Sequence, residues 1–166
     1  MSIRVLIADD EDGMRLVLQK ALQRHEDITI EAAVHNGQEA LEQFETLRPD
    51  LVFLDVEMPV CDGLEAARRI QELSPDTPIV FVTAHESYRP QAFEVYATDY
   101  LVKPFSLERL DETLQRVRRQ LALRRAAEMP PAPQTPVRLP LAGRILIKGR
   151  DETVLLRVED IVLIKR

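Results

Sequence analysis

Short apolar runs alternate with amphipathic segments five times along residues 1–125, and this alternation constrains the possible folds most. The apolar runs have the length of buried strands, and they are Ile3–Ala8, Ile28–Val34, Leu51–Asp55, Ile79–Thr83 and Asp99–Val102. Five successive strand–helix units favour a parallel sheet covered by helices on both faces. Because crossovers are right-handed, few strand orders remain, and 2-1-3-4-5 is common for five units. We therefore expect a flavodoxin-like, doubly wound α/β fold with this strand order.

The segments between the predicted strands have helical spacing. The first carries an apolar stripe that we expect to face the core: Met14, Val17, Leu18, Ala21 and Leu22. Asn36 and Glu39 form a predicted capping pair for a second helix, which ends before Pro49. A third helix is predicted over 63–73, and a fourth, with the weakest pattern, over 87–96.

The sequence predicts three successive parts: a domain over 1–125, a linker over 126–143 and a fragment over 144–166. A fifth helix opens at Ser106 and overruns the first domain, because 115–128 contains neither Gly nor Pro. Five prolines follow between residues 129 and 143, which is typical of a semi-rigid linker. Strand patterns then occupy Arg144–Lys148, Thr153–Val158 and Ile161–Ile164. This short β-rich fragment is too small to form a core, so we expect it to open an incomplete second domain.

Composition and charge exclude several classes of function. No apolar run approaches the ~18 residues that a membrane span requires, and the N-terminus lacks a secretory pattern. The single cysteine, Cys61, excludes an internal disulfide framework, and we expect a cytoplasmic protein and a free thiol. Residues 1–125 hold 23 acidic and 15 basic residues, a formal net charge of −8, which makes this part a poor nucleic-acid binder by itself.

Three carboxylates follow neighbouring strands of the predicted sheet. Asp9 and Asp10 come after the first strand, and Asp55 closes the third. In the expected strand order these two strands are adjacent, so the carboxylates should meet at the edge where doubly wound folds bind ligands. Three anions repel one another unless a cation lies among them, and oxygen ligands suit Mg²⁺. The sequence therefore predicts a magnesium site.

A hydroxyl and an ammonium group complete this predicted site. The fourth strand ends at Thr83, and Lys103 follows the fifth strand. The set suits phosphoryl transfer to a carboxylate, in which Asp55 is the nucleophile, Lys103 and Mg²⁺ neutralise the phosphoryl oxygens and Thr83 donates a hydrogen bond. Glu57 and His85, two positions after Asp55 and Thr83, are predicted to flank the phosphate and to tune its hydrolysis.

Residues 3–124 resemble the receiver domains of two-component response regulators. The resemblance is carried by Ala8-Asp9-Asp10-Glu11, by Leu54-Asp55-Val56-Glu57-Met58-Pro59 with Asp62-Gly63, by Val82-Thr83-Ala84, and by Tyr100-Leu101-Val102-Lys103-Pro104-Phe105. It implies a phosphoacceptor with slow autodephosphorylation and not an enzyme that acts on free substrates.

The resemblance also implies roles for individual residues. Asp10, Asp55 and the backbone carbonyl of Glu57 would bind Mg²⁺ directly, and Asp9 would act through water. The Lys103-Pro104 peptide bond would be cis. Tyr100 would be the switch aromatic, which moves inward when Thr83 turns toward the phosphate.

The segment from Ala92-Phe93-Glu94-Val95 to Asp99-Tyr100-Leu101 is similar to regulators with a LytTR-type (LytR/AlgR-like) DNA-binding output domain. Residues 144–148 and 158–162 resemble the opening strands of that domain. The resemblance implies a sensor histidine kinase as phosphodonor, docked on the helix after Glu11. It implies a homodimer through helix 4, strand 5 and helix 5. DNA would be bound only through a complete output domain, and not by this chain, and no membrane partner is expected.

Two alternatives belong to other classes of function. One is a phosphate-independent, receiver-like binding module, against which the complete set of Asp9, Asp10, Asp55, Thr83 and Lys103 argues. The other is a hydrolase or phosphotransferase that forms an aspartyl-phosphate. Such enzymes usually carry a second Asp two residues after the nucleophile, where this chain has Glu57, and turnover of free substrates would distinguish them.

Overall fold

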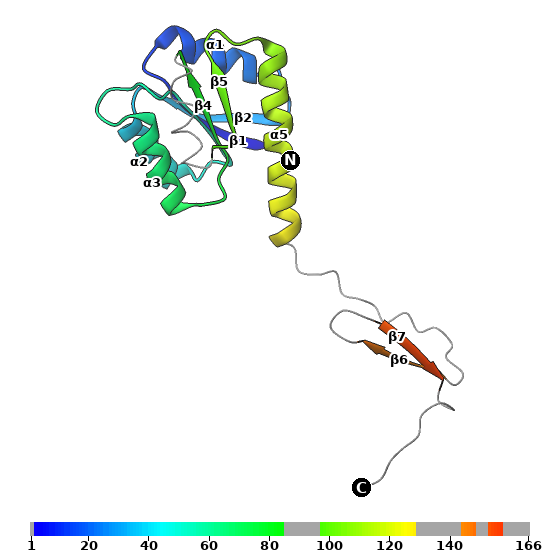
Figure 1. The fold of residues 1–166 in the computed structure, drawn as a ribbon. Coiled ribbons are helices and arrows are strands. Elements are labelled where there is room, and N and C mark those ends of the chain that lie inside the picture. Colours follow the sequence, from blue (N-terminus) through cyan, green and yellow to red (C-terminus); the bar gives the residue numbers. More distant parts are fainter. Residues whose placement is uncertain (1, 85–96, 129–143, 149–152, 158–166) are drawn as a thin grey trace. The chain divides into compact units, whose positions relative to one another are not determined.

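The computed structural model describes residues 2–84, 97–128, 144–148 and 153–157 (Figure 1). The chain divides into two compact units, Met1–Glu128 and Met129–Arg166, and each is described by itself. Across these described ranges, no helix combines the length and apolarity that would let it cross a membrane. The predicted fourth helix and the predicted strand Ile161–Ile164 lie outside the described residues.

The first unit is built on a five-stranded parallel sheet in the order β2-β1-β3-β4-β5. The strands are β1 (Ile3–Ala8), β2 (Ile28–Val34), β3 (Leu51–Leu54), β4 (Ile79–Thr83) and β5 (Asp99–Val102). The predicted fold class and strand order are therefore confirmed. The strand β3 ends one residue before its predicted end, although the Asp55 N–H still donates to the Ala8 carbonyl at 2.8 Å.

The described part of the unit has four helices. Three connect strands, α1 (Asp12–Leu22), α2 (Gly37–Leu47) and α3 (Gly63–Leu73), and α5 (Leu107–Glu128) follows β5. The predicted capping pair is confirmed, because the Glu39 N–H donates to Asn36 Oδ1 at 2.9 Å. The Glu39 carboxylate in turn accepts a hydrogen bond from the His35 N–H at 3.1 Å. The first of these bonds satisfies an amide group that the first turn of a helix leaves without a partner.

The helices cover the sheet on both faces (Figure 1). One core cluster packs α2 and α3 on alternate residues of the sheet, among them Leu6, Val52 and Phe81. The other cluster packs α1 and α5 on the strand residues in between, whose side chains point to the opposite face of the sheet, among them Phe53 and Val80. Successive side chains of a strand point to opposite faces, so a strand buried on both sides must be apolar throughout.

The predicted stripe of α1 is wrong at Val17, whose side chain is 53% exposed. Leu18 and Leu22 are buried as expected, but Arg15 shares their side of the helix and is also buried. Its Nη1 donates to the Asp9 carbonyl at 2.6 Å. Residues two positions apart in a helix differ in direction by about 200° around its axis. Because Arg15 points inward, Val17 points toward solvent.

The described part of the second unit is an antiparallel hairpin of β6 (Arg144–Lys148) and β7 (Thr153–Arg157). Arg144 lies opposite Arg157, and Lys148 lies opposite Thr153. The predicted pair of strands is therefore confirmed, with β7 one residue shorter than expected. The linker boundaries and the assignment of 144–166 to an incomplete output domain stay predictions.

Candidate functional site

The backbone places two aspartates side by side at the carboxyl ends of β1 and β3. The Asp9 N–H donates to the Val34 carbonyl of β2 at 3.1 Å, and the Asp55 N–H donates to the Ala8 carbonyl of β1 at 2.8 Å. Each aspartate thus extends the hydrogen bonding between its strand and the neighbouring strand by one residue. Both side chains are buried, with Asp9 2% exposed and Asp55 5% exposed.

Asp9, Glu11 and Asp55 form an acidic cluster in which one carboxylate oxygen from each lies within 4.8 Å of the others. The Glu11 N–H donates to Asp9 Oδ1 at 2.9 Å, which places Glu11 just before α1 begins. The sequence reasoning did not include Glu11 in the site. Its position directly after the acid pair was the available signal, since a residue that precedes a helix can turn back toward the strand end.

Lys103 lies among the three carboxylates of the acidic cluster. Its N–H donates to the Thr83 carbonyl at 2.8 Å, which aligns the residue with the end of β4. Its Nζ is 2.6 Å from Asp55 Oδ2, 2.8 Å from Asp9 Oδ2 and 3.0 Å from Glu11 Oε1. The side chain is 7% exposed, and the peptide bond between Lys103 and Pro104 is cis.

Burial and charge act against each other at this cluster. Burial raises the pKa of Asp9 above its usual range, although hydrogen bonds from Lys103 and from the Glu11 N–H oppose the shift. For Lys103 burial disfavours the charged form, but hydrogen bonds to Asp55 and Asp9 outweigh it and raise the pKa above its usual value. The ammonium group is therefore protonated at neutral pH and partly neutralises the carboxylates.

The other two predicted metal ligands, Asp10 and Glu57, are exposed and line a neighbouring hollow of about 510 Å³. The Glu57 N–H donates to Asp55 Oδ1 at 3.2 Å, which ties this loop to the buried aspartate. The structure thus divides the predicted ligands between the acidic cluster and the adjacent hollow. All of the donors are oxygens, and carboxylate and carbonyl oxygens with an open side are the ligands that suit Mg²⁺.

The predicted switch residues lie on β4, which pairs with β3, and on β5, the next strand of the sheet. Thr83 is buried at the end of β4, where Val102 of β5 is its partner in the ladder. Tyr100 is half-buried on β5 and packs against the core cluster formed with α2 and α3. His85, the second predicted phosphate-flanking residue, lies outside the described residues.

Gly63 supports the backbone of Asp55 directly. A Cβ at this position would clash with the Asp55 carbonyl group, and the Gly63 N–H donates to the Val56 carbonyl at 2.9 Å. The preceding Asp62 caps α3 by accepting a hydrogen bond from the Glu65 N–H at 2.8 Å. Sequence reasoning did not assign this role to Gly63, since the close approach joins residues eight positions apart.

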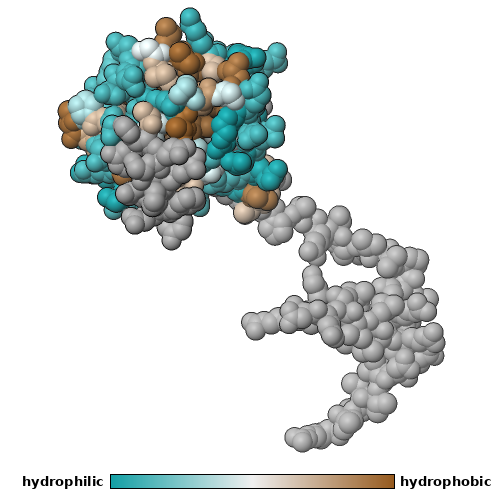
Figure 2. Space-filling model, turned by 45° about the horizontal axis from the view of Figure 1, so that its top comes forward, coloured by the Kyte–Doolittle hydropathy of each residue, from teal (hydrophilic) through white to brown (hydrophobic). Residues whose placement is uncertain are grey.

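The surface of the first unit carries several exposed apolar side chains among hydrophilic ones, and Figure 2 shows apolar residues gathered on the face turned forward. Large apolar side chains that are exposed include Leu16 and Val17 on α1, at 50% and 53%, and Val60 after β3, at 85%. Exposed apolar residues next to a polar site are a common feature of surfaces that dock another protein.

Comparisons with known proteins identify the family. The family model described as the response regulator receiver domain matches residues 5–115. The sensory transduction protein LytT of Oceanobacillus iheyensis is 40% identical over 127 residues, which cover 75% of this chain and 52% of LytT. The transcriptional regulatory protein BtsR of Escherichia coli is 36% identical over 98% of this chain and 65% of its own length. The chain thus spans about half to two thirds of these curated relatives.

Solved structures agree with this result. The receiver domain of AraT, a response regulator from Geobacillus stearothermophilus, matches with a TM-score of 0.71 at 31% identity, over 75% of this chain and 99% of that one. The Vibrio cholerae chemotaxis protein CheY4 matches with a TM-score of 0.64 at 35% identity, over 70% of this chain and 99% of that one. The match to LytT is consistent with the predicted LytTR-type subgroup. The chain belongs to the response regulator receiver domain family.

Proposed function

We propose that Asp55 accepts a phosphoryl group from the phosphohistidine of a sensor kinase, with Mg²⁺, and that phosphorylation switches the output of a transcription regulator. One observation carries the proposal: the Lys103 ammonium group lies 2.6 Å from Asp55 Oδ2, beside the buried carboxylates of Asp9 and Asp55 at the strand ends. A buried cation at this point attracts the phosphoryl oxygens as they approach the Asp55 carboxylate.

The transfer needs no proton from the acceptor. An Asp55 carboxylate oxygen forms a bond to phosphorus while the phosphorus–nitrogen bond of the phosphohistidine breaks, and the electron pair of that bond stays on the imidazole. Lys103 then shifts its contacts toward the new phosphoryl oxygens, and Thr83 donates a hydrogen bond to one of them. Hydrolysis by water later returns the carboxylate and inorganic phosphate, so the chain acts as a switch with no substrate turnover of its own.

Asp9, Asp10, Asp55 and the backbone carbonyl of Glu57 would hold the metal. When bound, Mg²⁺ supplies positive charge that offsets the carboxylates and the phosphoryl oxygens. The buried position of Asp9 and Asp55 fits this role, because buried carboxylates require a cationic partner. Glu57 and His85 flank the phosphate in this proposal and set how long it survives.

The kinase docks beside the acceptor in this proposal. Leu16 and Val17 lie exposed on α1, the helix that follows the acidic cluster. They provide an apolar contact on the helix that follows Glu11, and they do not line the hollow of Asp10 and Glu57. This arrangement brings the phosphohistidine of the partner to the carboxyl ends of the strands.

The output face in this proposal consists of β5, α5 and the predicted helix over 87–96. The strand β5 is at the edge of the sheet and carries Tyr100, whose movement with Thr83 would reshape this face after phosphorylation. Two receivers would then dimerise through it. DNA would be bound by an output domain of the LytTR type, of which 144–166 is the opening part.

The test is phosphorylation of the full chain with acetyl phosphate and Mg²⁺. Intact mass spectrometry is expected to show one phosphoryl adduct on the wild type and none on Asp55→Asn. Asp76→Asn is the matched control, because this exposed carboxylate lies in the turn before β4, at the opposite end of that strand from Thr83. Size-exclusion chromatography of the same samples is expected to show a shift toward dimer only where the adduct forms.

Other outcomes would point elsewhere. An adduct on both Asp55→Asn and the wild type would disprove Asp55 as the acceptor. No adduct on any sample with Mg²⁺ present would favour a phosphate-independent binding module. Rapid turnover of free phosphorylated substrates would favour a phosphotransferase or hydrolase.

A further inference from the structure

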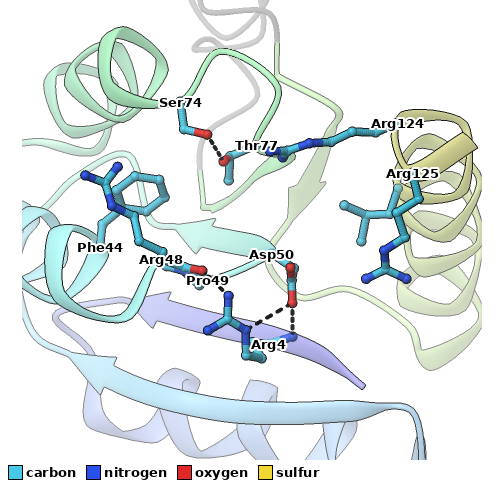
Figure 3. A pocket seen from close by; sticks show the side chains of 10 residues that line it. Arg4, Phe44, Arg48, Pro49, Asp50, Ser74, Thr77, Arg124 and Arg125 are labelled. Atoms are coloured by element: carbon cyan, nitrogen blue, oxygen red, sulfur yellow. Dashed lines mark hydrogen bonds and ion pairs between the residues drawn. The ribbon is translucent and has the colours of Figure 1, made fainter. Parts of the chain in front are cut away.

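The first unit has a second hollow, of about 310 Å³, at the end of the sheet opposite the acidic cluster. Arg4 near the start of β1, Asp50 before β3 and Thr77 before β4 line it (Figure 3). Asp9 follows Arg4 by five residues along β1, so the two sites lie about 16 Å apart at ~3.3 Å per strand residue. A ligand in this hollow would therefore not compete with phosphorylation of Asp55.

Four arginines from three separate segments line this basic hollow: Arg4, Arg48, Arg124 and Arg125. Asp50 is the one carboxylate among its described lining residues, which leaves a net formal charge of +3. Guanidinium groups that share a small space repel one another. The described residues that line the hollow do not include an equal number of carboxylates, and a bound anion would reduce this repulsion.

Arg4 and Asp50 form the floor of the basic hollow. Arg4 Nε is 3.4 Å from Asp50 Oδ2, and Arg4 Nη1 donates to the Leu47 carbonyl at 3.0 Å. A further hydrogen bond joins Arg4 to the Arg48 carbonyl. Arg4 thereby binds the carbonyl groups at the carboxyl end of α2, where a cation is stabilising. Asp50 forms its ion pair with Arg4.

The remaining arginines and two hydroxyls form the rim. Arg48 ends α2 with a φ of 48° and packs its guanidinium carbon 5.9 Å from the centre of the Phe44 ring. Figure 3 shows Arg124 extending from α5 toward Thr77, with Arg125 on the same helix. Thr77 donates to Ser74 Oγ at 2.9 Å, and both hydroxyl residues line the hollow.

We propose that the basic hollow binds a compact phosphate-bearing anion through its diphosphate group. Planar guanidinium groups pair with phosphate oxygens through two parallel hydrogen bonds, and hydroxyls add further donors. The apolar residues that line the hollow, Phe44, Pro49 and Leu121, are buried and present little surface to a ligand. Recognition thus rests on the anion itself, whether it comes as inorganic pyrophosphate or as part of a nucleoside diphosphate.

Binding would fix the end of α5 against the sheet. Arg124 and Arg125 lie in the last turns of α5, which ends at Glu128 where the first compact unit ends. Arg48 follows α2, and Thr77 precedes β4. An anion held by these groups links three segments that are far apart in sequence, so it would stabilise the unit and the helix that leads out of it.

The test is isothermal titration of the full chain with sodium pyrophosphate and, separately, with ADP. EDTA keeps metal from recruiting the anions to the acidic cluster, where three carboxylates then repel them. Saturable binding is expected, and Arg124→Ala/Arg125→Ala should weaken it about tenfold or more because charge-assisted hydrogen bonds are lost. Arg68→Ala/Arg119→Ala is the matched control, since it removes two exposed charges that do not line the hollow.

The two ligands distinguish the source of the anion. Equal affinities would show that the diphosphate group alone is recognised, and tighter binding of ADP would identify a nucleotide as the ligand. Arg48→Ala serves as a second variant, and thermal unfolding without ligand confirms that each variant is folded. Phosphorylation of Asp55, measured on the same samples with Mg²⁺, should not change.

Three results would overturn the proposal. One is the absence of saturable pyrophosphate and ADP binding to the wild type. Another is an equal loss of affinity in the rim and control variants, which would reveal only a general attraction to positive charge. The third is tight binding of a single-stranded oligonucleotide without saturable pyrophosphate binding, which would make the hollow part of a nucleic-acid surface.

Discussion

Lys103 offsets the charge of the acidic cluster, and this gives a prediction at the scale of one residue. Replacing it with Met leaves Asp9 and Asp55 buried without their ammonium partner. We expect the free energy of unfolding in EDTA to fall by about 3 kcal/mol, as when one partner of a buried ion pair is removed. Mg²⁺ should then stabilise the variant more than the wild type, because the cluster has become more negative.

Urea unfolding with and without Mg²⁺ measures both effects. Lys20→Met is the control, since this exposed lysine of α1 has no part in the cluster. An equal response of Lys103→Met and the wild type to Mg²⁺ would show that the ammonium group and the metal do not share the carboxylates.

Gly63 gives a second prediction at this scale. In Gly63→Ala the new methyl group meets the Asp55 carbonyl, so we expect a loss of about 2 kcal/mol in unfolding free energy, typical of overpacking. Phosphorylation of Asp55 should slow as well, because its backbone must move. Gly13→Ala is the control: no atom lies within 4 Å of its added Cβ, and alanine in α1 should stabilise by about 0.5–1 kcal/mol.

The two glycine variants are compared by thermal unfolding and by the rate of adduct formation with acetyl phosphate. If Gly63→Ala were as stable and as reactive as Gly13→Ala, the close packing against Asp55 would be unimportant.

The site residues differ in how far the sequence could predict them. Asp9, Asp55 and Lys103 follow apolar runs, and parallel strands bring such positions to one edge. The presence of Glu11 in the acidic cluster was not predicted, because its position depends on where α1 begins. The start of a helix is uncertain by one or two residues. The contact of Gly63 with Asp55 depends on the path of a loop, which no periodicity describes.

Asp99 joins two elements, β5 and α5. Its side chain is 8% exposed and accepts hydrogen bonds from Arg109 Nη2 at 2.6 Å, from Thr113 Oγ1 at 2.7 Å and from Arg116 Nη1 at 2.7 Å. Arg109 Nη2 also donates to the Tyr100 carbonyl at 3.1 Å. This network fixes the predicted output face, so a change at Tyr100 must be accommodated by α5.

The network gives a prediction at the scale of elements. Burial opposes the charge of Asp99, but hydrogen bonds from Arg109 and Thr113 outweigh it and lower the pKa below the usual 3.8. Because the pKa of Asp99 is lower in the folded than in the unfolded chain, the ionised carboxylate stabilises the fold above pH 3.8. This contribution is lost as the pH falls through the folded-state pKa. We expect Asp99→Asn to cost roughly 2 kcal/mol at pH 7, with a difference from wild type that shrinks below pH 4.

Urea unfolding between pH 7 and pH 3 measures this difference. Asp27→Asn is an informative comparison, because Arg118 of α5 donates to Asp27 at 2.7 Å and lowers its pKa too. That pair is 33% and 39% exposed, so solvent screening should hold its contribution below about 1 kcal/mol. A pH-independent cost of Asp99→Asn would contradict the assigned ionic network.

Strands proved easier to predict than the faces of helices. Four of the five strands of the first unit end where the apolar runs end, because a strand buried on both sides admits few polar residues. The error at Val17 arose because a buried arginine competes with apolar residues for the inner face of α1. Arg109, Thr113 and Arg116 are spaced i, i+4 and i+7 and so share one face of α5, but this spacing does not indicate Asp99 as their partner.

At the scale of the whole molecule, the two core clusters lie entirely between Ile3 and Leu121. The sequence placed the end of the first domain near this point, because the prolines begin soon afterwards. It could not show the basic hollow, whose arginines come from β1, the end of α2 and the end of α5. Such a site exists only once the chain is folded.

The position of the core gives the last prediction. A chain of residues 1–128 keeps every residue of both clusters, so its free energy of unfolding should match that of the first unit in the full chain within about 0.5 kcal/mol. A chain of residues 1–115 covers the part that the family model matches but lacks Val117 and Leu121 of the core and the Arg118 partner of Asp27. We expect it to lose at least about 3 kcal/mol.

Urea unfolding followed by circular dichroism, together with adduct formation on Asp55, compares the three chains. The decisive comparison is between 1–128 and 1–115, since both lack the hairpin of β6 and β7 and differ only in the second half of α5. Equal stability of these two would mean that residues 116–128 add nothing to the core. A marked loss in 1–128 relative to the full chain would mean that the first unit depends on residues 129–166, because its own apolar residues would then be insufficient to hold α5 on the sheet.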